Sequence, residues 1–123
     1  MAGELILVVE DDAKSRRLVR DVLEYRGFQV AEAAAGDDGV RLARELVPAL
    51  VLMDIQLPGL DGIAALGLLR ADPVTRSIPV VAVTASAMPD DRGRIRAAGF
   101  DAYQGKPINV QAFLALVEGM LAR

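Results

Sequence analysis

The chain has 123 residues, which fits one domain and leaves little room for a second. It contains neither cysteine nor histidine, so disulfides, thiolate metal sites, Cys nucleophiles and Ser-His-Asp triads are excluded. The formal net charge of −3 argues against a nucleic-acid-binding surface, which normally shows an excess of basic residues. Any chemistry must therefore rest on carboxylates, hydroxyls, lysine and the backbone.

Strand-like and helix-like segments alternate along the sequence. Short β-rich apolar runs predict strands, and longer stretches with apolar residues at helical spacing predict helices. In chain order, the predicted elements are strand 5–9, helix 13–26, strand 28–33, helix 37–47, strand 49–55, a helix that follows the turn 57–62 and ends near residue 70, strand 78–83, helix 89–98, strand 100–104 and helix 109–122. In the first helix, the apolar stripe contains Leu18, Val19, Val22 and Leu23, and Gly27 ends the helix.

Five strands that are each followed by a helix predict a parallel sheet with helices on both faces. The third strand is almost wholly apolar, which is the pattern of a strand covered on both sides. Right-handed crossovers and a switch point favour the strand order 2-1-3-4-5. We therefore expect a three-layer α/β sandwich of the flavodoxin-like (βα)5 type, with residues 1–123 forming a single domain.

Polar residues stand at the carboxyl ends of several predicted strands. The side chains concerned are Glu10 and Asp11 after the first strand, Asp54 at the end of the third, Thr84 at the end of the fourth and Lys106 just beyond the fifth. Because all strands of a parallel sheet end at the same edge, where open α/β sheets bind ligands, we expect these groups to form one pocket.

The pocket predicts magnesium-dependent phosphoryl transfer. Closely spaced carboxylates repel one another unless a cation lies between them, and ligation by oxygen alone suits Mg²⁺. An aspartate such as Asp54 can attack phosphorus and hold an aspartyl phosphate. The ammonium of Lys106 and the hydroxyl of Thr84 would balance charge on the phosphoryl oxygens. Of the 14 basic residues only Lys14 and Lys106 are lysines, so a lysine at this edge of the sheet is more indicative of a function than an arginine would be.

Each of these residues also has a purely structural interpretation. The acidic run can serve as a helix N-cap, which is the role we expect for Asp12. Asp54 can be a turn former, Thr84 an ordinary β-branched strand residue, and Lys106 an exposed loop lysine. Only their occurrence together at one edge favours the catalytic interpretation.

Four motifs carry a family resemblance: VVEDD at residues 8–12, LMDIQLPGLDG at 52–62, PVVAVTA at 79–85 and AYQGKPI at 102–108. Together they resemble the receiver domain of bacterial two-component response regulators, over essentially the whole chain. The resemblance implies that Asp54 is the phosphoacceptor and that Lys106 is the phosphate-binding lysine. It implies that Thr84 and Tyr103 form the switch pair. It also implies four Mg²⁺ ligands, namely Glu10, Asp11, Asp54 and the backbone carbonyl of Gln56.

The resemblance also implies a function. A sensor histidine kinase or a phosphotransfer protein would donate the phosphoryl group, and the chain would signal to a downstream protein through helix 89–98, strand 100–104 and helix 109–122. It implies a stand-alone regulator similar to chemotaxis and cell-division regulators, or equally a receiver excised from a larger protein, without turnover of a separate small molecule. It further implies a cis Lys106–Pro107 bond and control of dephosphorylation by the Gln56 side chain. Tyr103 can instead be an ordinary edge-strand aromatic residue.

Other classes remain as alternatives. A haloacid-dehalogenase-type phosphatase also uses a strand-end aspartate and Mg²⁺, but it typically carries a second aspartate where this chain has Gln56. A nucleotide-binding flavodoxin-like domain needs a glycine-rich loop after the first strand, where this chain is acidic. A degenerate receiver, used only for protein contacts, would not need Asp54, Thr84 and Lys106 together.

Partners and location are expected from surface features. Lys14, Ser15 and Leu18 on the first helix are candidate contacts for a partner helical bundle, although helical spacing favours Leu18 and Val22 as core residues. Gly93 weakens helix 89–98, which makes that helix a candidate mobile element.

The apolar run near the N-terminus is far shorter than a membrane span, and no basic segment precedes it. We therefore expect a cytoplasmic protein with neither membrane nor nucleic-acid partners.

Overall fold

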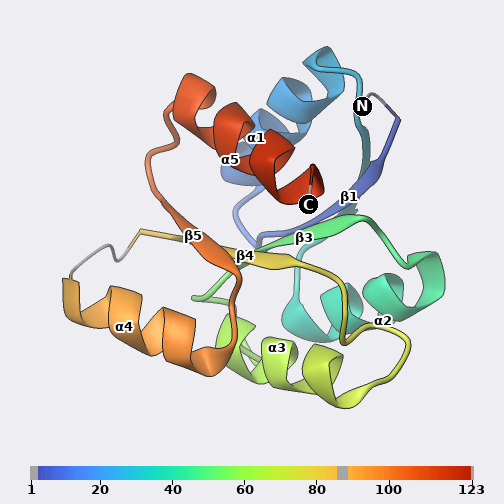
Figure 1. Ribbon diagram of the computed structural model, residues 1–123, viewed down its shortest axis with the longest axis vertical. Coiled ribbons are helices and arrows are strands. Elements are labelled where there is room, and N and C mark those ends of the chain that lie inside the picture. The colour runs from blue at the N-terminus through green and yellow to red at the C-terminus, as the bar shows by residue number, and fades with distance from the viewer. Residues whose placement is uncertain (1–2, 86–88, 123) are drawn as a thin grey trace.

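The computed structural model describes residues 3–85 and 89–122, which form five strands and five helices in alternation (Figure 1). The strands are β1 Leu5–Val9, β2 Gln29–Ala33, β3 Leu50–Asp54, β4 Val80–Thr84 and β5 Ala102–Gly105. The helices are α1 Ala13–Tyr25, α2 Gly36–Leu46, α3 Gly62–Ala71, α4 Pro89–Ala98 and α5 Val110–Leu121. The predicted order of elements is confirmed, and predicted ends differ from observed ends by no more than two residues.

The sheet has the predicted order β2-β1-β3-β4-β5, and every neighbouring pair is parallel. Helices α1 and α5 cover one face, and α2, α3 and α4 cover the other (Figure 1). Alternate strand residues supply the two cores: Leu7 and Val9 pack under α2 and α3, whereas Ile6 and Val8 pack under α1 and α5. The predicted three-layer α/β sandwich is therefore confirmed.

Helix α1 begins as expected but buries a different set of residues. Asp12 is its N-cap, and its carboxylate accepts a hydrogen bond from the Ser15 backbone N–H at 2.9 Å. The prediction that Leu18 belongs to the core is wrong, because its side chain is 48% exposed. Val19 and Leu23, one turn apart, take the buried stripe, and Val22 is only partly buried beside them.

Within the described residues, no helix is both long enough and apolar enough to cross a lipid bilayer. The longest helix, α1, has 13 residues, whereas a transmembrane helix needs about 20.

A close backbone contact holds the start of α3 against the end of β3. A Cβ atom at Gly62 would lie 2.3 Å from the Asp54 carbonyl oxygen and 2.7 Å from the Ile55 Cα. We expect Gly62→Ala to lower the free energy of unfolding by about 1–3 kcal/mol, because strand and helix must separate to admit the methyl group. Urea unfolding followed by circular dichroism measures the change.

Gly67, in the middle of the same helix, provides the matched control. A Cβ atom there meets nothing within 4 Å. Gly67→Ala should therefore raise the free energy of unfolding by about 0.5–1 kcal/mol through lower backbone entropy in the unfolded state. Equal effects from the two substitutions would show that the contact with Asp54 is unimportant.

Candidate functional site

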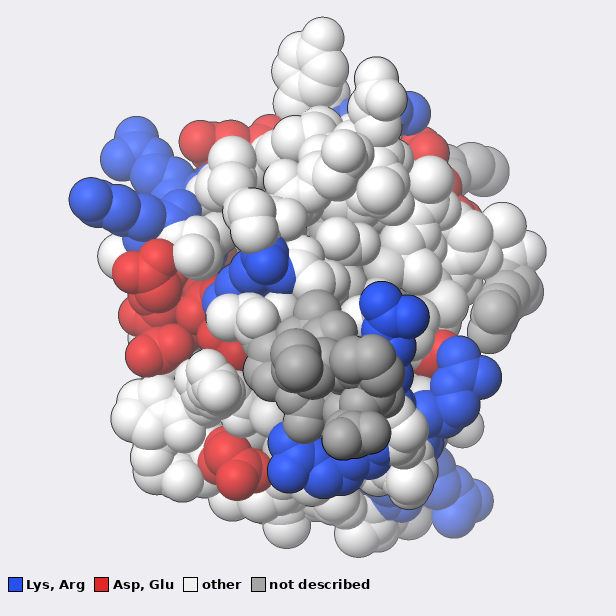
Figure 2. Space-filling view, turned by 90° about the vertical axis from the view of Figure 1, so that its left-hand side faces the viewer, with Lys and Arg blue, Asp and Glu red and all other residues white. Residues whose placement is uncertain are grey.

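The predicted site residues meet at the carboxyl edge of the sheet. Glu10 directly follows β1, Asp54 ends β3, Thr84 ends β4 and Lys106 directly follows β5. The Lys106 backbone N–H donates to the Thr84 carbonyl oxygen at 2.9 Å, so β4 and β5 stay paired up to the site. Figure 2 looks onto this edge and shows acidic side chains grouped at the left of the face, beside basic side chains. Four distant segments are thus brought together as predicted.

Three carboxylates form a compact cluster that can hold a metal ion. One oxygen from each of Glu10, Asp11 and Asp54 lies within 4.8 Å of the others. Glu10 and Asp54 are 4% and 6% exposed, whereas Asp11 is exposed to solvent. Oxygen ligands with one open side fit Mg²⁺, which keeps several of its waters in proteins. The donor set therefore fits the predicted cofactor.

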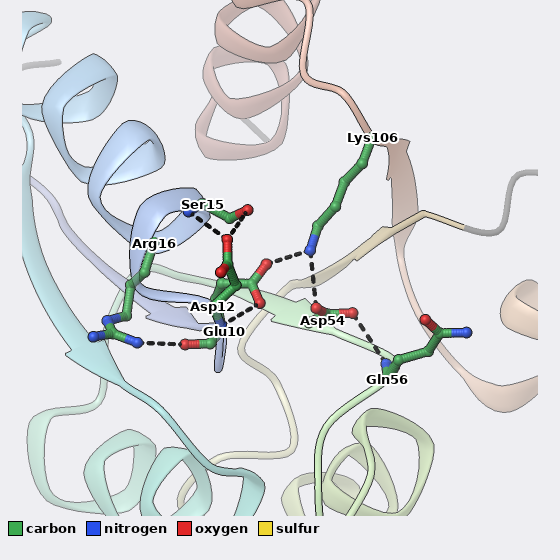
Figure 3. Close-up of polar contacts among 7 residues, drawn as sticks. All are labelled: Glu10, Asp12, Ser15, Arg16, Asp54, Gln56 and Lys106. Atoms are coloured by element: carbon green, nitrogen blue, oxygen red, sulfur yellow. Dashed lines mark hydrogen bonds and ion pairs between the residues drawn. The ribbon is translucent and has the colours of Figure 1, made fainter.

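Lys106 extends across the pocket and contacts two of these carboxylates (Figure 3). Its Nζ donates to Asp54 Oδ2 at 2.9 Å and also donates to Glu10 Oε1. Desolvation alone would lower the pKa of Lys106, but hydrogen bonds and charges from Glu10 and Asp54 outweigh it and raise the pKa above its ordinary value. The lysine therefore stays positively charged beside Asp54. The following Lys106–Pro107 peptide bond is cis, as the family resemblance implied.

The Asp54 carboxylate is held at both oxygens. Its Oδ1 accepts a hydrogen bond from the Gln56 backbone N–H at 3.0 Å, while Oδ2 accepts from Lys106 (Figure 3). The Gln56 side chain itself is exposed. Asp54 therefore has a fixed orientation at the end of β3.

Thr84 and Tyr103 lie on the same face of the sheet, under α4. Tyr103 is paired with Ala82 in the β4–β5 ladder, and Thr84 is two residues further along β4, so both side chains project to one side. Thr84 is 1% exposed, whereas Tyr103 is half-buried. The Arg92 guanidinium of α4 lies 5.1 Å from the centre of the Tyr103 ring. The two predicted switch residues therefore lie on the same face of the sheet beside α4, offset by two residues along the paired strands.

Burial changes the acid–base behaviour of Glu10. Desolvation raises the pKa of Glu10, and nearby Asp54 adds to the rise, although the hydrogen bond from Lys106 opposes it. A raised carboxyl pKa means that the fold favours the protonated form. Protonated Glu10 therefore stabilises the folded chain. This contribution is fully present below the ordinary pKa of 4.5 and is lost as the pH rises through the raised pKa of Glu10.

We therefore expect Glu10→Gln to melt at a higher temperature than wild type at pH 7 in EDTA, because the neutral amide avoids burying a charge. The difference should shrink as the pH falls toward 4.5. Mg²⁺ at ten times its Kd should stabilise wild type by about 1.4 kcal/mol and the variant far less. Thermal unfolding with and without Mg²⁺ measures both effects, and a variant less stable than wild type in EDTA would contradict the assigned pKa shift.

Sequence reasoning missed one residue of this region, Arg16. Its Nη1 donates to the Glu10 backbone carbonyl oxygen at 2.8 Å, and its Nε donates to Glu32 Oε1 in β2 at 3.2 Å. An arginine on the polar side of an amphipathic helix carries no local signal of such contacts. Only the proximity of α1 to the ends of β1 and β2 reveals them.

Comparisons with known proteins agree with this geometry. Residues 6–118 match the family described as response regulator receiver domain. The polar-differentiation response regulators DivK of Brucella ovis and of Brucella anthropi are each 41% identical to the chain over 116 residues. The match covers 94% of this chain and 94% of each relative.

Solved structures show the same fold. A putative response regulator from Chloroflexus aurantiacus matches 98% of the chain and 99% of its own length, with a TM-score of 0.93 and 28% identity. The receiver domain of the sensor histidine kinase PA1611 from Pseudomonas aeruginosa, with a magnesium ion coordinated in its active site cleft, covers 99% of this chain and 100% of its own, with a TM-score of 0.92 and 32% identity. Since the family match spans most of the sequence, the chain belongs to the response regulator receiver domain family.

Proposed function

We propose that this chain is a signalling switch in which Asp54 accepts a phosphoryl group from a sensor histidine kinase or a histidine phosphotransfer protein, in a Mg²⁺-dependent reaction. The observation that carries this proposal is the position of the Asp54 carboxylate, between the acidic cluster and the Lys106 ammonium. Membership of the receiver family supports it and indicates a response regulator and not a conventional enzyme.

The chemistry follows from the groups around Asp54. An Asp54 oxygen attacks phosphorus as the phosphorus–nitrogen bond of the donor phosphohistidine breaks, and the aspartyl phosphate keeps the transferred oxygens. Glu10, Asp11 and Asp54 would hold Mg²⁺ together with the Gln56 backbone carbonyl, and the bound ion supplies positive charge beside those oxygens. Lys106 supplies a second positive charge, and Thr84 a hydrogen-bond donor, on the other sides.

Acetyl phosphate tests the proposal without a partner protein. Incubation with acetyl phosphate and Mg²⁺ should add the mass of one phosphoryl group, and EDTA should prevent the addition. The adduct should be labile in base, as an acyl phosphate is. Continuous turnover of acetyl phosphate without a trapped adduct, at a rate typical of enzymes, would instead favour the phosphatase alternative.

A small pocket beside the site supports docking of the phosphoryl donor. It has a volume of about 150 Å³. The charged Glu10 and Lys106 line it together with the apolar Leu18, Pro107 and Ile108. Leu18 is half-exposed at its rim. Exposed apolar groups beside a reactive carboxylate suit contact with a helical donor that carries a phosphohistidine.

We expect Leu18→Ala to slow transfer from a phosphorylated histidine donor by about tenfold, because the interface loses a buried apolar side chain. Phosphorylation by acetyl phosphate should keep its rate, since the small donor needs no interface. Leu46→Ala on α2 is the control, because Leu46 is 44% exposed, close to the 48% of Leu18, and this substitution should change neither rate. Equal slowing with both donors would contradict a docking role.

The signal would leave through the face formed by α4, β5 and α5. Phosphorylation adds about −1.5 to −2 charges at Asp54 and lets the Thr84 hydroxyl move toward the new oxygens. Tyr103 would turn into the vacated space and change the groove of about 200 Å³ that contains Arg92, Ile95, Arg96 and Tyr103. Amide exchange that leaves α4 as protected as α5, and unchanged by phosphorylation, would contradict this route.

We infer that residues 1–123 act as one receiver unit, which gives its output through protein contacts in the cytoplasm. Similarity to polar-differentiation response regulators over 94% of the chain supports a regulatory role. The downstream target is then a protein and not a nucleic acid or a membrane. A comparison of proteins captured by the phosphorylated chain and by Asp54→Asn tests this assignment, and identical capture would contradict it.

A further inference from the structure

Arg16 links three segments behind the acidic cluster. It lies in α1, and its guanidinium bonds the Glu10 carbonyl oxygen at the end of β1 and the Glu32 carboxylate in β2 (Figure 3 shows the bond to Glu10). The Arg16 and Glu32 side chains are 23% and 27% exposed, so both are largely shielded from water. A planar guanidinium held at two nitrogens has a defined position and orientation.

The carbonyl that Arg16 binds belongs to the peptide between Glu10 and Asp11. Both of these candidate metal ligands branch from the Cα atoms at the two ends of that peptide. Because a peptide unit is planar, a hydrogen bond to its oxygen restricts the direction in which each of the two side chains leaves the backbone. The Glu10 backbone N–H is bonded to the Ala33 carbonyl oxygen at 3.0 Å, and Glu10 Oε2 accepts from the Asp12 backbone N–H at 3.1 Å.

We propose that Arg16 is a positioning residue of the Mg²⁺ site, which acts through the Glu10–Asp11 peptide to hold the two carboxylates at the separation that Mg²⁺ requires. This role rests on the proposed function, since it needs a pocket that binds Mg²⁺. Mg²⁺ demands near-octahedral geometry at short distances, whereas Ca²⁺ accepts longer and more variable ones. Loosening the peptide should therefore weaken Mg²⁺ binding more than Ca²⁺ binding.

Arg20 is the matched control on the same helix. Its Nη1 lies 2.7 Å from Glu32 Oε2, and its Nε lies 3.3 Å from Glu24 Oε1. It therefore shares the Glu32 carboxylate with Arg16. Its ion pairs are with the carboxylates of Glu24 and Glu32, and they do not involve the Glu10 backbone carbonyl. A variant at Arg20 disturbs the charge network of α1 and β2 and leaves the bond to the Glu10 carbonyl in place.

Isothermal titration of the full chain with Mg²⁺ and with Ca²⁺ tests this role in wild type, Arg16→Met, Arg16→Lys and Arg20→Met. Arg16→Met should bind Mg²⁺ about tenfold more weakly, within the range that residues supporting metal ligands show, and should lose less affinity for Ca²⁺. Arg16→Lys should be intermediate, because an ammonium can still reach one of the two partners. Arg20→Met should bind both ions as wild type does.

Phosphorylation by acetyl phosphate gives a second measurement. In Arg16→Met the Mg²⁺ concentration for half-maximal rate should rise by the same factor, while the rate at saturating Mg²⁺ stays near that of wild type. Equal Mg²⁺ affinity in wild type and Arg16→Met overturns this role alone, as does an equal loss in Arg20→Met. If Arg16→Met does not fold, wild-type affinity in Arg16→Lys overturns it. A wild-type chain that binds no Mg²⁺ overturns this role and the proposed function together.

Discussion

Replacing Asp54 with asparagine is expected to abolish the phosphoryl adduct that acetyl phosphate and Mg²⁺ form on the wild-type chain. The amide nitrogen and oxygen of asparagine lack the negative charge and nucleophilicity of a carboxylate, so no acyl phosphate can form. The substitution also removes one of the three carboxylates of the acidic cluster, which should weaken Mg²⁺ binding. Intact-mass spectrometry after incubation measures the adduct directly.

Two further measurements show whether Asp54→Asn is folded and whether loss of the adduct is specific to position 54. Asp54 is 6% exposed beside Glu10, and a neutral residue there relieves repulsion, so the melting temperature should not fall. Asp12→Asn is the matched control at the same edge, because asparagine also caps helices and Asp12 is the α1 N-cap. Asp12→Asn should keep the full adduct. A wild-type amount of adduct on Asp54→Asn would place the phosphoryl group on a different residue.

Replacing Lys106 with methionine is expected to slow phosphorylation by acetyl phosphate by about 10²–10³-fold at saturating Mg²⁺, because the reaction loses a preorganised positive charge. Methionine keeps a flexible apolar chain of similar length in the same space. The Lys106 Nζ lies 2.9 Å from Asp54 Oδ2, where charge develops on the transferring group. Quenched samples analysed by intact mass give the rate.

The same substitution should also lower stability in EDTA. Lys106 compensates two buried carboxylates, and its raised pKa contributes stability that is fully present below pH 10.5 and is lost only above it. We expect a loss of about 1–3 kcal/mol in urea unfolding at pH 7, less than for a fully buried pair because the Lys106 side chain is 21% exposed. Mg²⁺ should restore part of this loss.

Lys14→Met is the control for both measurements. Lys14 is the chain's other lysine, and it is exposed on α1. Its replacement should leave the phosphorylation rate and the free energy of unfolding near their wild-type values. If Lys14→Met slows phosphorylation as much as Lys106→Met does, a general charge effect, and not the contact with Asp54, explains the result.

The sequence by itself determined the fold and the membership of the pocket. Alternating strand and helix patterns specify a parallel sheet, and parallel strands must end at one edge, so Asp54, Thr84 and Lys106 could be placed together from their positions along the chain. The N-cap role of Asp12 was equally predictable, because capping depends on residues three apart. These features follow from local periodicity and from connectivity alone.

Only the tertiary structure decided the burial of Leu18 and the contacts of Arg16. An apolar stripe shows which side of a helix is apolar but not how far its neighbours cover it, so Leu18 was expected inside and is 48% exposed. Arg16 is bonded to Glu10 and Glu32, residues 6 and 16 positions away, across two strand ends. Such contacts depend on how helix and strands pack, and no short-range pattern in the sequence records that packing.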